Sequence, residues 1–339
     1  MKKLTKISLA LLAAAMLLSG CSKSNSKKDY ILATGGTSGT YYPFGGAIAN
    51  IWNTKIENMN VTAQATGASA ENLRLINKGE AEYAIVQNDV MDYAYNGTDL
   101  FAGEKLANIM TIGTLYPEVV QIAVSKDSGI KSIADFKGKR ISVGDAGSGV
   151  EFNAKQILEG YGLTFDDIKK SNLSFKESAE AIQNGTLDGC FITAGVPNSA
   201  LQELAFTAGL ILIPVDGAAA DAICAKYGYY TQTTIPAGTY KGTDTDTAAL
   251  AIKATLAVNA KSGSEINFFN LAVTLNGFPA RLNPSLFTST VILSAVPCVF
   301  FALIATLISF NALGKSGYLN IASEIPKSTL KLGNTSPYI

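Results

Sequence analysis

Two glycine-rich loops hold the residues of this chain that are best suited to bind a ligand. The first loop reads GGTSGTYY over residues 35–42, and the second reads GDAGSGVE over residues 144–151. Each follows a short apolar run and precedes an amphipathic stretch, which predicts a strand, a tight turn and the start of a helix. Backbone N–H groups in the first turn of a helix attract a carboxylate or a phosphate, helped by the helix dipole. The loops therefore predict an anion-binding site.

The first loop matches no nucleotide-binding motif. No Lys-Ser or Lys-Thr pair follows its glycines at the spacing of a P-loop, and it lacks the Gly-x-Gly-x-x-Gly fingerprint. A plain tight turn is the alternative for the first loop, but its adjacent Tyr41 and Tyr42 and its hydroxyl side chains favour binding. In the second loop, Ser148 and Glu151 have the spacing of a capping box, so capping and ligand contact both remain open there.

Further candidates stand where predicted strands end. In open α/β sheets, ligands bind beside the carboxyl ends of the strands. The serine that opens the helical stretch after residues 60–64 is equally suited to cap that helix and to contact a ligand. These strand-end candidates are Ser69, Gln87, Tyr116, Gly195 and Pro197.

The segments that must position these residues follow a pattern that occurs twice along the chain. LRLINKGEAE at residues 73–82 and AEAIQNGTLD at residues 179–188 each predict a helix that ends near a glycine and leads into a strand. Together with the two loops, this repeat predicts two similar α/β lobes. Two such lobes facing each other would enclose a ligand cleft.

The composition excludes most catalytic and metal chemistry. The 339 residues include no histidine, which removes histidine triads, imidazole bases and histidine-containing metal sites. Cys190, Cys224 and Cys298 lack the paired spacing of zinc or redox motifs. A disulfide between Cys190 and Cys224 and a pair of buried free thiols both remain open. TDTDT at residues 243–247 lacks the other ligands of a calcium loop. We predict no catalytic residue, no metal and no cofactor.

The charged residues predict an anionic solute held mainly by neutral groups. Arginine occurs only as Arg74, Arg140 and Arg281, and the first two are placed away from the loops by the predicted elements. Without an arginine clamp, backbone amides and hydroxyls must bind the anion. Lys plus Arg and Asp plus Glu both number 27. Loss of the N-terminal lysines leaves a slightly negative protein, which has no nucleic-acid footprint.

The N-terminus predicts export and a lipid anchor. Lys2, Lys3 and Lys6 precede a charge-free apolar stretch at residues 7–18 that is too short to span a bilayer comfortably. The stretch ends in LSGC, which resembles the bacterial lipobox. We therefore assign residues 1–20 to a lipoprotein signal peptide, Cys21 to lipidation and residues 21–29 to a flexible linker.

Four motifs carry a resemblance to a known family. Their order and spacing resemble the TAXI family of solute receptors, which serve TRAP transporters, and the likeness covers about residues 30–258. It implies an α/β, two-lobed type II periplasmic binding protein-like fold with a central ligand cleft and hinge strands. We assign residues 30–120 plus 236–260 to lobe one and residues 121–235 to lobe two. The motifs are ATGGTSGTYYPFGG at residues 33–46, AIVQND at 84–89, DFKGKRISVG at 135–144 and GSG at 147–149.

The resemblance implies a receptor rather than an enzyme. It would capture a small carboxylate, either a glutamate-like amino acid or a dicarboxylate, and deliver it to the membrane subunits of a TRAP transporter. The family loop usually reads GSGTE, and Val150 replaces its Thr here, so one hydroxyl is lost. The ligand-binding residues carried over by motif are Thr37, Gly39, Thr40, Tyr41, Ser69 and Gln87 in lobe one, and Ser148, Glu151 and Asn153 in lobe two.

Two other functions remain open. A pyrimidine-precursor synthase of related two-lobed fold is the enzymatic alternative, but its chemistry would require histidines that this chain lacks. A surface adhesin or sensor that uses the same cleft is the second alternative.

Residues 261–339 depart from the family pattern. Residues 282–314 carry no charge, and residues 286–313 are long enough to cross a membrane. A second membrane anchor, a core helix hairpin and a frameshifted reading frame are the alternatives. We favour the frameshift because composition and motif change together at one point.

Overall fold

The computed structural model describes residues 27–260 of the chain. The predicted signal peptide, the lipidation at Cys21 and the atypical tail lie outside the described residues. Within residues 27–260, no helix combines the length and the apolar character that a bilayer crossing requires.

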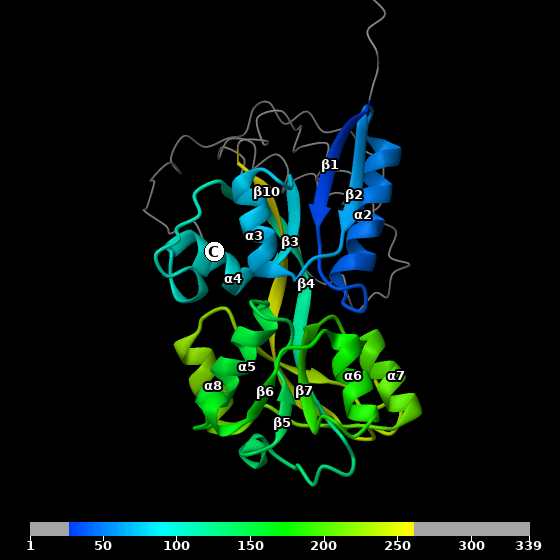
Figure 1. The fold of residues 1–339 in the computed structure, drawn as a ribbon, viewed down its shortest axis with the longest axis vertical. Helices are drawn as coiled ribbons and strands as arrows, with labels where there is room; N and C mark the ends of the chain where they lie inside the picture. The colour runs from blue at the N-terminus through cyan, green and yellow to red at the C-terminus, as the bar shows by residue number, and fades with distance from the viewer. Residues whose placement is uncertain (1–26, 261–339) are drawn as a thin grey trace, which may run out of the picture.

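The described chain forms two α/β lobes that are stacked along the long axis of the molecule (Figure 1). Their strands join one hydrogen-bonded sheet of order β2-β1-β3-β10-β4-β7-β5-β6, with β8 paired to β4 and β9 paired to β10. The structure thus confirms the predicted α/β fold class.

In lobe one, helices cover both faces of a short sheet. β1 pairs in parallel with β2 and β3, and β3 is buried along its whole length because its side chains alternate between two cores. Tyr83 and Ile85 pack toward α2, and Ala84 and Val86 pack toward α3 and α4. The elements are β1 (Lys28–Ala33), α2 (Tyr41–Lys55), β2 (Met59–Gln64), α3 (Ser69–Lys78), β3 (Tyr83–Gln87), α4 (Asn88–Asn96) and the short helix η1 (Asp99–Phe101).

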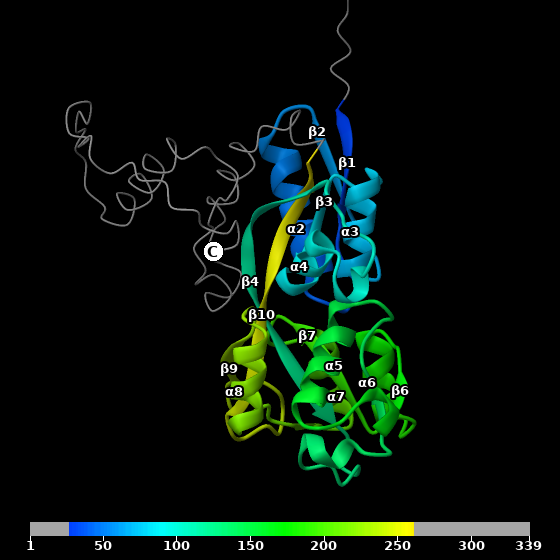
Figure 2. The same ribbon diagram turned by 90° about the vertical axis from the view of Figure 1, so that its left-hand side faces the viewer.

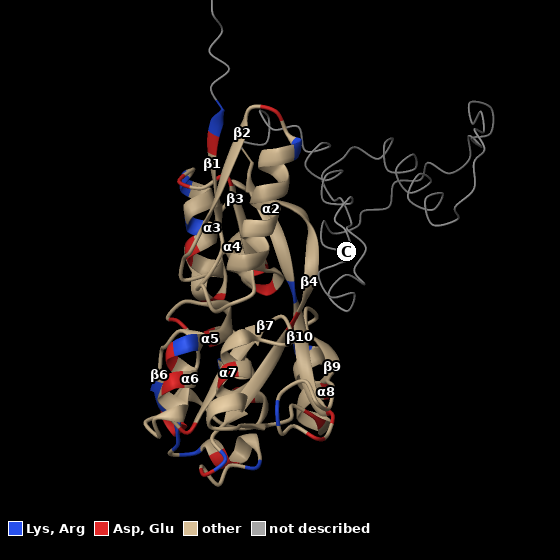
Figure 3. Ribbon diagram, turned by 90° about the vertical axis from the view of Figure 1, so that its right-hand side faces the viewer, with Lys and Arg blue, Asp and Glu red and all other residues tan. Residues whose placement is uncertain are grey.

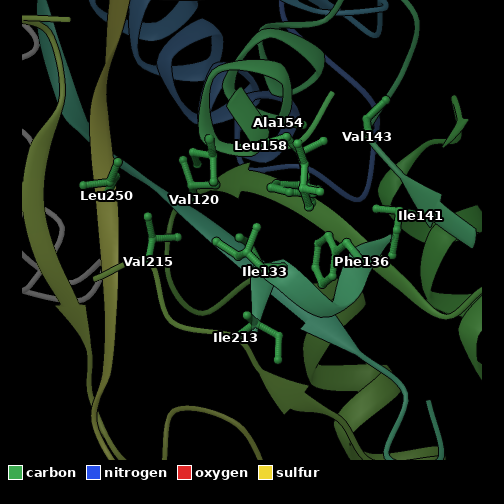
Figure 4. Packing of buried hydrophobic residues seen from close by; sticks show 14 of the residues in the cluster. Val120, Ile133, Phe136, Ile141, Val143, Ala154, Leu158, Ile213, Val215 and Leu250 are labelled. Atoms are coloured by element: carbon green, nitrogen blue, oxygen red, sulfur yellow. The ribbon is translucent and has the colours of Figure 1, made fainter. Parts of the chain in front are cut away.

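Lobe two repeats this arrangement. β5 pairs in parallel with β6 and β7, α5 and α8 cover one face of the sheet, and α6 and α7 cover the other. Figure 4 shows the core beneath α5, in which Ala154 and Leu158 pack with Phe136 and Ile141. The elements are η2 (Ile133–Phe136), β5 (Arg140–Ser142), α5 (Gly149–Gly160), η3 (Phe165–Asp167), β6 (Lys169–Ser171), α6 (Phe175–Gln183), β7 (Gly189–Ala194), α7 (Ser199–Thr207), β8 (Ile211–Leu212), α8 (Gly217–Lys226) and β9 (Thr231–Ile235).

Two long antiparallel strands connect the lobes. β4 (Ile109–Val124) and β10 (Thr247–Asn259) lie side by side and run through both lobes (Figure 2). β4 pairs with β7 of lobe two from Val119 onward, and β10 pairs with β3 of lobe one from Ala254 onward. Because these strands are the continuous elements between the lobes, a bend within them would change the angle between the lobes.

The chain returns to lobe one later than we assigned from the sequence. Residues 236–251, assigned to lobe one, lie with lobe two. Tyr240 is 1% exposed in a core that it shares with α6 and α7. Residues 247–251 of β10 pair with β9. The physical reason is this burial of Tyr240, which holds the segment before β10 against lobe two.

The two described cysteines are free thiols. Cys190 is buried in β7, and Cys224 is half-buried in α8. Burial raises the pKa of the Cys190 thiol to about 12. The free-thiol alternative therefore describes this structure, and Cys190 is an unreactive core residue.

Candidate functional site

A cavity of about 50 Å³ lies between the lobes, where the two glycine-rich loops meet. Lobe one contributes the first loop, the beginning of α3 and the end of β3. Lobe two contributes the second loop, the beginning of α6 and Thr193 in β7, and Glu118 of the long strand β4 completes the wall. Of the predicted site residues, the cavity brings together Gly39, Thr40, Tyr41, Ser69, Gln87 and Ser148.

The cavity wall is built from the beginnings of helices. Thr40, Gln87 and Ser148 are the N-cap residues of α2, α4 and α5, and all three line the cavity. Ser69 and Phe175, the first residues of α3 and α6, line it as well. The first N–H groups of a helix have no partner within that helix, and the positive end of its dipole lies there.

The helix beginnings direct N–H groups and the positive ends of their dipoles toward the cavity. Among residues 27–260, neither Lys nor Arg lines the cavity. In Figure 3, charged residues mark α3 of lobe one and helices of lobe two, whereas α2 has Lys55 as its single charged residue. An anion in the cavity would therefore be bound by amides, hydroxyls and helix dipoles.

Glycines allow the second loop to turn into α5. Gly144 and Gly147 have φ angles of 85° and 73°, which other residues rarely adopt. Ser148 then caps α5, since its Oγ accepts the Glu151 N–H at 3.4 Å. The Glu151 carboxylate folds back to accept the Gly147 N–H at 2.8 Å and pairs with Lys170 at 2.7 Å. Glu151 thus stabilises the loop and does not line the cavity, whereas Ser148 does both.

Glu118 is a buried carboxyl group in the cavity wall. Its side chain is 2% exposed, and the Tyr41 hydroxyl donates a 2.6 Å hydrogen bond to its Oε2. Burial raises the pKa of Glu118 to about 8, although the Tyr41 bond lowers it. Burial thus favours the protonated form of this carboxyl group, and a cation beside it would favour the ionised form. The sequence analysis missed Glu118, whose signal is a charged residue within an apolar strand.

Several other cavity residues were also missed by the sequence analysis. Asp145 belongs to the second loop, and its pKa is raised by burial and by repulsion from Glu177. Ser38 and Gly149 belong to the two predicted loops, and Ala68 directly precedes Ser69, but none of the three was named as a ligand contact. Ser174, Phe175 and Thr193 had no local signal of a binding role, because they reach the cavity only through the packing of the lobes.

Gln87 and Gly149 meet across the cleft. Gln87 is 3% exposed, and its N–H donates to Ser69 Oγ at 3.0 Å. Its Oε1 has no hydrogen-bond partner among the described residues. A Cβ atom on residue 149 would lie 1.8 Å from that oxygen. Glycine at position 149 therefore permits this close approach of the lobes, and the Gln87 oxygen is available to a donor on a ligand.

Other predicted site residues lie outside the cavity lining. Thr37 and Pro197 are exposed. Tyr116 is 1% exposed, and its ring packs edge-to-face on Phe44 in the core of lobe one. The structure therefore does not bring these residues to the cavity.

Two more predicted residues join the lobes directly. The Gly195 N–H of lobe two donates to Thr40 Oγ1 at 3.0 Å. Asn153 Nδ2 of lobe two donates to Asp89 Oδ2 at 3.1 Å, and both side chains are fully buried. These contacts show that the lobes of this structure are closed on each other.

The part of the chain that the structure describes contains no candidate metal-binding site. Among residues 27–260, no group of three or more Cys, Asp or Glu side chains is arranged to hold a metal ion.

Comparison with known proteins places the chain in a family. The sequence matches the NMT1-like family over residues 32–268, which is more than half of its length. The chain belongs to the NMT1-like family. The match includes both glycine-rich loops and all of the cavity residues.

The NMT1-like chain is similar in structure to solute-binding proteins. It matches the alkanesulfonate-binding protein SsuA from Xanthomonas axonopodis pv. citri, bound to MOPS, with a TM-score of 0.51 and 15% identity over 85% of this chain and 80% of that chain. The periplasmic aliphatic sulphonate binding protein SsuA from Escherichia coli matches with a TM-score of 0.46 and 18% identity, over 85% and 94% of the two chains. The arginine-bound form of truncated ArgBP from T. maritima matches with a TM-score of 0.47 and 9% identity, over 74% of this chain and 95% of that chain. The first match shows that this NMT1-like chain has a periplasmic binding protein-like fold.

Proposed function

We propose that this protein is an extracytoplasmic, lipid-anchored receptor that captures a small carboxylate and delivers it to a TRAP-type secondary transporter. The motifs that resemble TAXI receptors include the two loops of the cavity, and the NMT1-like family and the binding-protein fold agree with a receptor. The predicted signal peptide and the lipobox cysteine Cys21 support a position on the outer face of the cell membrane.

The observation that carries this proposal is the convergence of helix beginnings on one cavity without Lys or Arg. The first residues of α2, α3, α5 and α6 line it, and Gln87 brings the beginning of α4 to it. A carboxylate placed there would accept bonds from first-turn N–H groups and from hydroxyls such as Ser148 Oγ. The positive ends of the helix dipoles would offset its charge.

Glu118 favours an amino acid over a dicarboxylate. An ammonium group beside Glu118 would stabilise the ionised carboxylate. It would find a second acceptor in Gln87 Oε1, which has no hydrogen-bond partner among the described residues. A dicarboxylate would instead place a second negative charge near Glu118 and Asp145 in a wall without cations. We therefore infer that the ligand carries both a carboxylate and an ammonium group.

The size of the cavity favours a compact ligand. The enclosed part of the cavity is about 50 Å³, and roughly 10–15 Å³ suffices to hold one water molecule, so the space is that of a small solute. A small amino acid suits this degree of closure.

The proposed mechanism is a shift of population between open and closed lobes. A ligand that contacts both glycine-rich loops gains those contacts only in the closed form, so it favours closure. The bend would occur in β4 and β10, where the lobes are continuous. The transporter would then recognise the closed form.

The ligand class can be tested by calorimetry. The melting temperature of the purified protein is first measured with a panel of amino acids and dicarboxylates, because a ligand at 100 times its Kd stabilises the fold by about 2.7 kcal/mol. Titration at pH 7 in two buffers with different ionisation enthalpies then counts protons. Ionisation of Glu118 beside an amino acid should release protons relative to the Glu118→Gln variant, which shares every other titrating group. Binding of dicarboxylates alone, or no stabilisation by any member of the panel, would contradict the proposal.

Turnover distinguishes the receptor from an enzyme. The NMT1-like family includes enzymes of thiamine synthesis. A receptor should return its bound ligand chemically unchanged after hours of incubation, as measured by mass spectrometry. A product of altered mass would favour the enzymatic alternative.

A further inference from the structure

A second set of contacts joins the lobes beside the ligand cavity. It consists of polar side chains from α4 in lobe one and from α5 and residues 229–230 in lobe two, and none of them lines the cavity. We call this set the tyrosine–amide cluster. Its members are Asp89, Tyr93, Asn153, Gln156, Tyr229 and Tyr230.

The cluster crosses from lobe one to lobe two at two points of α4. Near the beginning of the helix, Asn153 Nδ2 donates to Asp89 Oδ2 at 3.1 Å. One turn later, Gln156 Nε2 donates to the Tyr93 hydroxyl at 2.6 Å. The Tyr93 and Tyr229 hydroxyls are also hydrogen-bonded, and their rings pack edge-to-face with centroids 6.0 Å apart. The lobes are therefore held together by specific bonds as well as by packing.

Within lobe two, the amides of the cluster are held in position. The Tyr230 hydroxyl accepts from Asn153 Nδ2 at 2.8 Å and donates to Gln156 Oε1 at 2.7 Å. Thr193 Oγ1 donates to Asn153 Oδ1 at 2.9 Å. Thr193 also lines the ligand cavity, so one residue connects the cluster to the ligand site.

We propose that the tyrosine–amide cluster is an inter-lobe latch, which stabilises the closed receptor through contacts that the ligand does not make. This inference rests on the proposed closure of the lobes around a ligand. Asp89, Asn153, Gln156 and Tyr93 are at most 7% exposed in the closed form. Their bonds must be made when closure removes them from water, since an unmade bond would leave a buried polar group unsatisfied. The latch therefore favours one closed geometry and determines which fraction of the protein is closed before a ligand binds.

The latch also contains a group that makes closure depend on pH. Asp89 is fully buried, and its Oδ1 has no hydrogen-bond partner among the described residues. Burial raises its pKa to about 7, although bonds from the backbone of α4 and from Asn153 lower it. No Lys or Arg forms an ion pair with it in the described part of the chain. The titratable groups that face it are Asp92 and Tyr93 from α4, Glu118 from β4, and Tyr229 and Tyr230 from lobe two.

The sign of this dependence follows from the two states of Asp89. In the closed form its pKa is about 7, and in an open form water would return it toward its ordinary value of about 3.9. The closed form therefore binds the proton more tightly. The closed-to-open ratio should fall as the pH rises from about 4 to 7 and should change little above pH 7.

Closure can be measured without any ligand. Dyes attached through unnatural amino acids at the exposed positions 78 in α3 and 155 in α5 of the full-length chain report the distance between the lobes by single-molecule energy transfer. We expect the closed fraction of the unliganded protein to fall between pH 5 and pH 8, with the closed-to-open ratio decreasing at least tenfold. Asp89→Asn, which keeps the acceptor for Asn153, should reduce this change markedly, and Glu118→Gln, measured beside it, gives the part that the cavity-wall carboxyl group contributes.

The tyrosines provide the second arm of the test. Tyr93→Phe keeps the ring and removes the hydroxyl, so the closed-to-open ratio should fall about three- to tenfold at pH 5. Tyr229→Phe, at a half-buried position, should act in the same direction. The matched control is Tyr95→Phe, an exposed tyrosine on the same helix, which should change nothing.

Three results would overturn the latch. They are an unliganded protein that is fully open at both pH values, a pH response that survives Asp89→Asn unchanged, and a Tyr93→Phe variant indistinguishable from Tyr95→Phe. Circular dichroism spectra identify a variant that has lost its fold, in which case Tyr229→Phe decides. Because no ligand is present, a wrong ligand assignment cannot produce any of these outcomes.

Discussion

The Tyr41 hydroxyl, at the beginning of α2, donates a 2.6 Å hydrogen bond to the carboxyl group of Glu118 in β4. The bond joins a glycine-loop helix to a strand that runs through both lobes, and both side chains line the ligand cavity. Tyr41 is 7% exposed and Glu118 is 2% exposed, so neither can exchange its partner for bulk water. The pair therefore defines the acidic side of a cavity whose other walls are helix beginnings.

Glu118→Gln should weaken the binding of an amino acid roughly 10- to 100-fold. The change removes the charge of a charge-assisted hydrogen bond, which contributes about 1.5–3 kcal/mol. Calorimetry in paired buffers should also show that proton release at pH 7 disappears. Tyr41→Phe is the matched variant, because it keeps the acid and removes the bond that lowers its pKa, so proton release should move to higher pH. An unchanged affinity in Glu118→Gln would show that the ligand does not contact this carboxyl group.

The stability of the unliganded protein should decrease between pH 5 and pH 8. Asp89 and Glu118 have folded-state pKa values of about 7 and about 8, above those of exposed carboxyl groups. The stability that their protonation contributes is fully present below the unfolded pKa, near 4, and is lost as the pH rises through the folded pKa. Each group contributes a slope of up to about 1.4 kcal/mol per pH unit.

Urea unfolding at several pH values tests this decrease. Asp89→Asn and Glu118→Gln should each flatten the curve above pH 5. Carboxyl groups whose pKa is lowered by hydrogen bonds, such as Asp135 and Glu177, lose their stabilising effect at lower pH and provide an internal contrast. A curve that is flat from pH 5 to pH 8 in the unchanged protein would contradict the burial of the two acids.

Gly149→Ala should weaken ligand binding by holding the lobes apart. The added methyl group would lie 1.8 Å from Gln87 Oε1, so either the Gln87 side chain or the lobe must move. Gly46→Ala in α2 is the control, because a methyl group at this position would have no neighbouring atom within 4 Å. It should stabilise the helix by about 0.5–1 kcal/mol. Ligand affinity and the inter-lobe distance are the measurements. Equal affinity in the two alanine variants would show that closure tolerates a side chain at position 149.

Ser148→Ala and Glu151→Gln should separate ligand contact from loop support. Ser148 both caps α5 and lines the cavity, so its loss should cost about 1 kcal/mol of stability and also weaken ligand binding severalfold. Glu151 does not line the cavity, and its carboxylate bonds the Gly147 N–H and Lys170. Glu151→Gln should therefore lower the free energy of unfolding by less than about 1 kcal/mol and change the ligand affinity less than twofold. Denaturant unfolding and ligand titration of both variants provide the comparison. A large loss of ligand affinity in Glu151→Gln would show that Glu151 contacts the ligand.

The sequence by itself determined the features that depend on local chemistry. The glycine-rich loops, the helices that follow them and the apolar strands are encoded within short segments, which is why the α/β class and the two loops were predicted. The absence of histidine and the scarcity of arginine were visible as well. The predicted positions of Arg74 and Arg140 agree with their pairing with Glu104 and Asp188, away from the cavity.

Only the tertiary structure decided which of these residues meet. Tyr41 and Glu118 are separated by 77 residues, and Thr40 and Gly195 by 155, so no local pattern relates them. The same is true of Asn153, which was carried to the ligand site by motif and instead bonds Asp89 between the lobes. The burial of Tyr240 likewise placed residues 236–251 with lobe two. Local sequence fixes where a helix begins, but the partner of a buried polar group is set by the packing of elements that are distant in the chain.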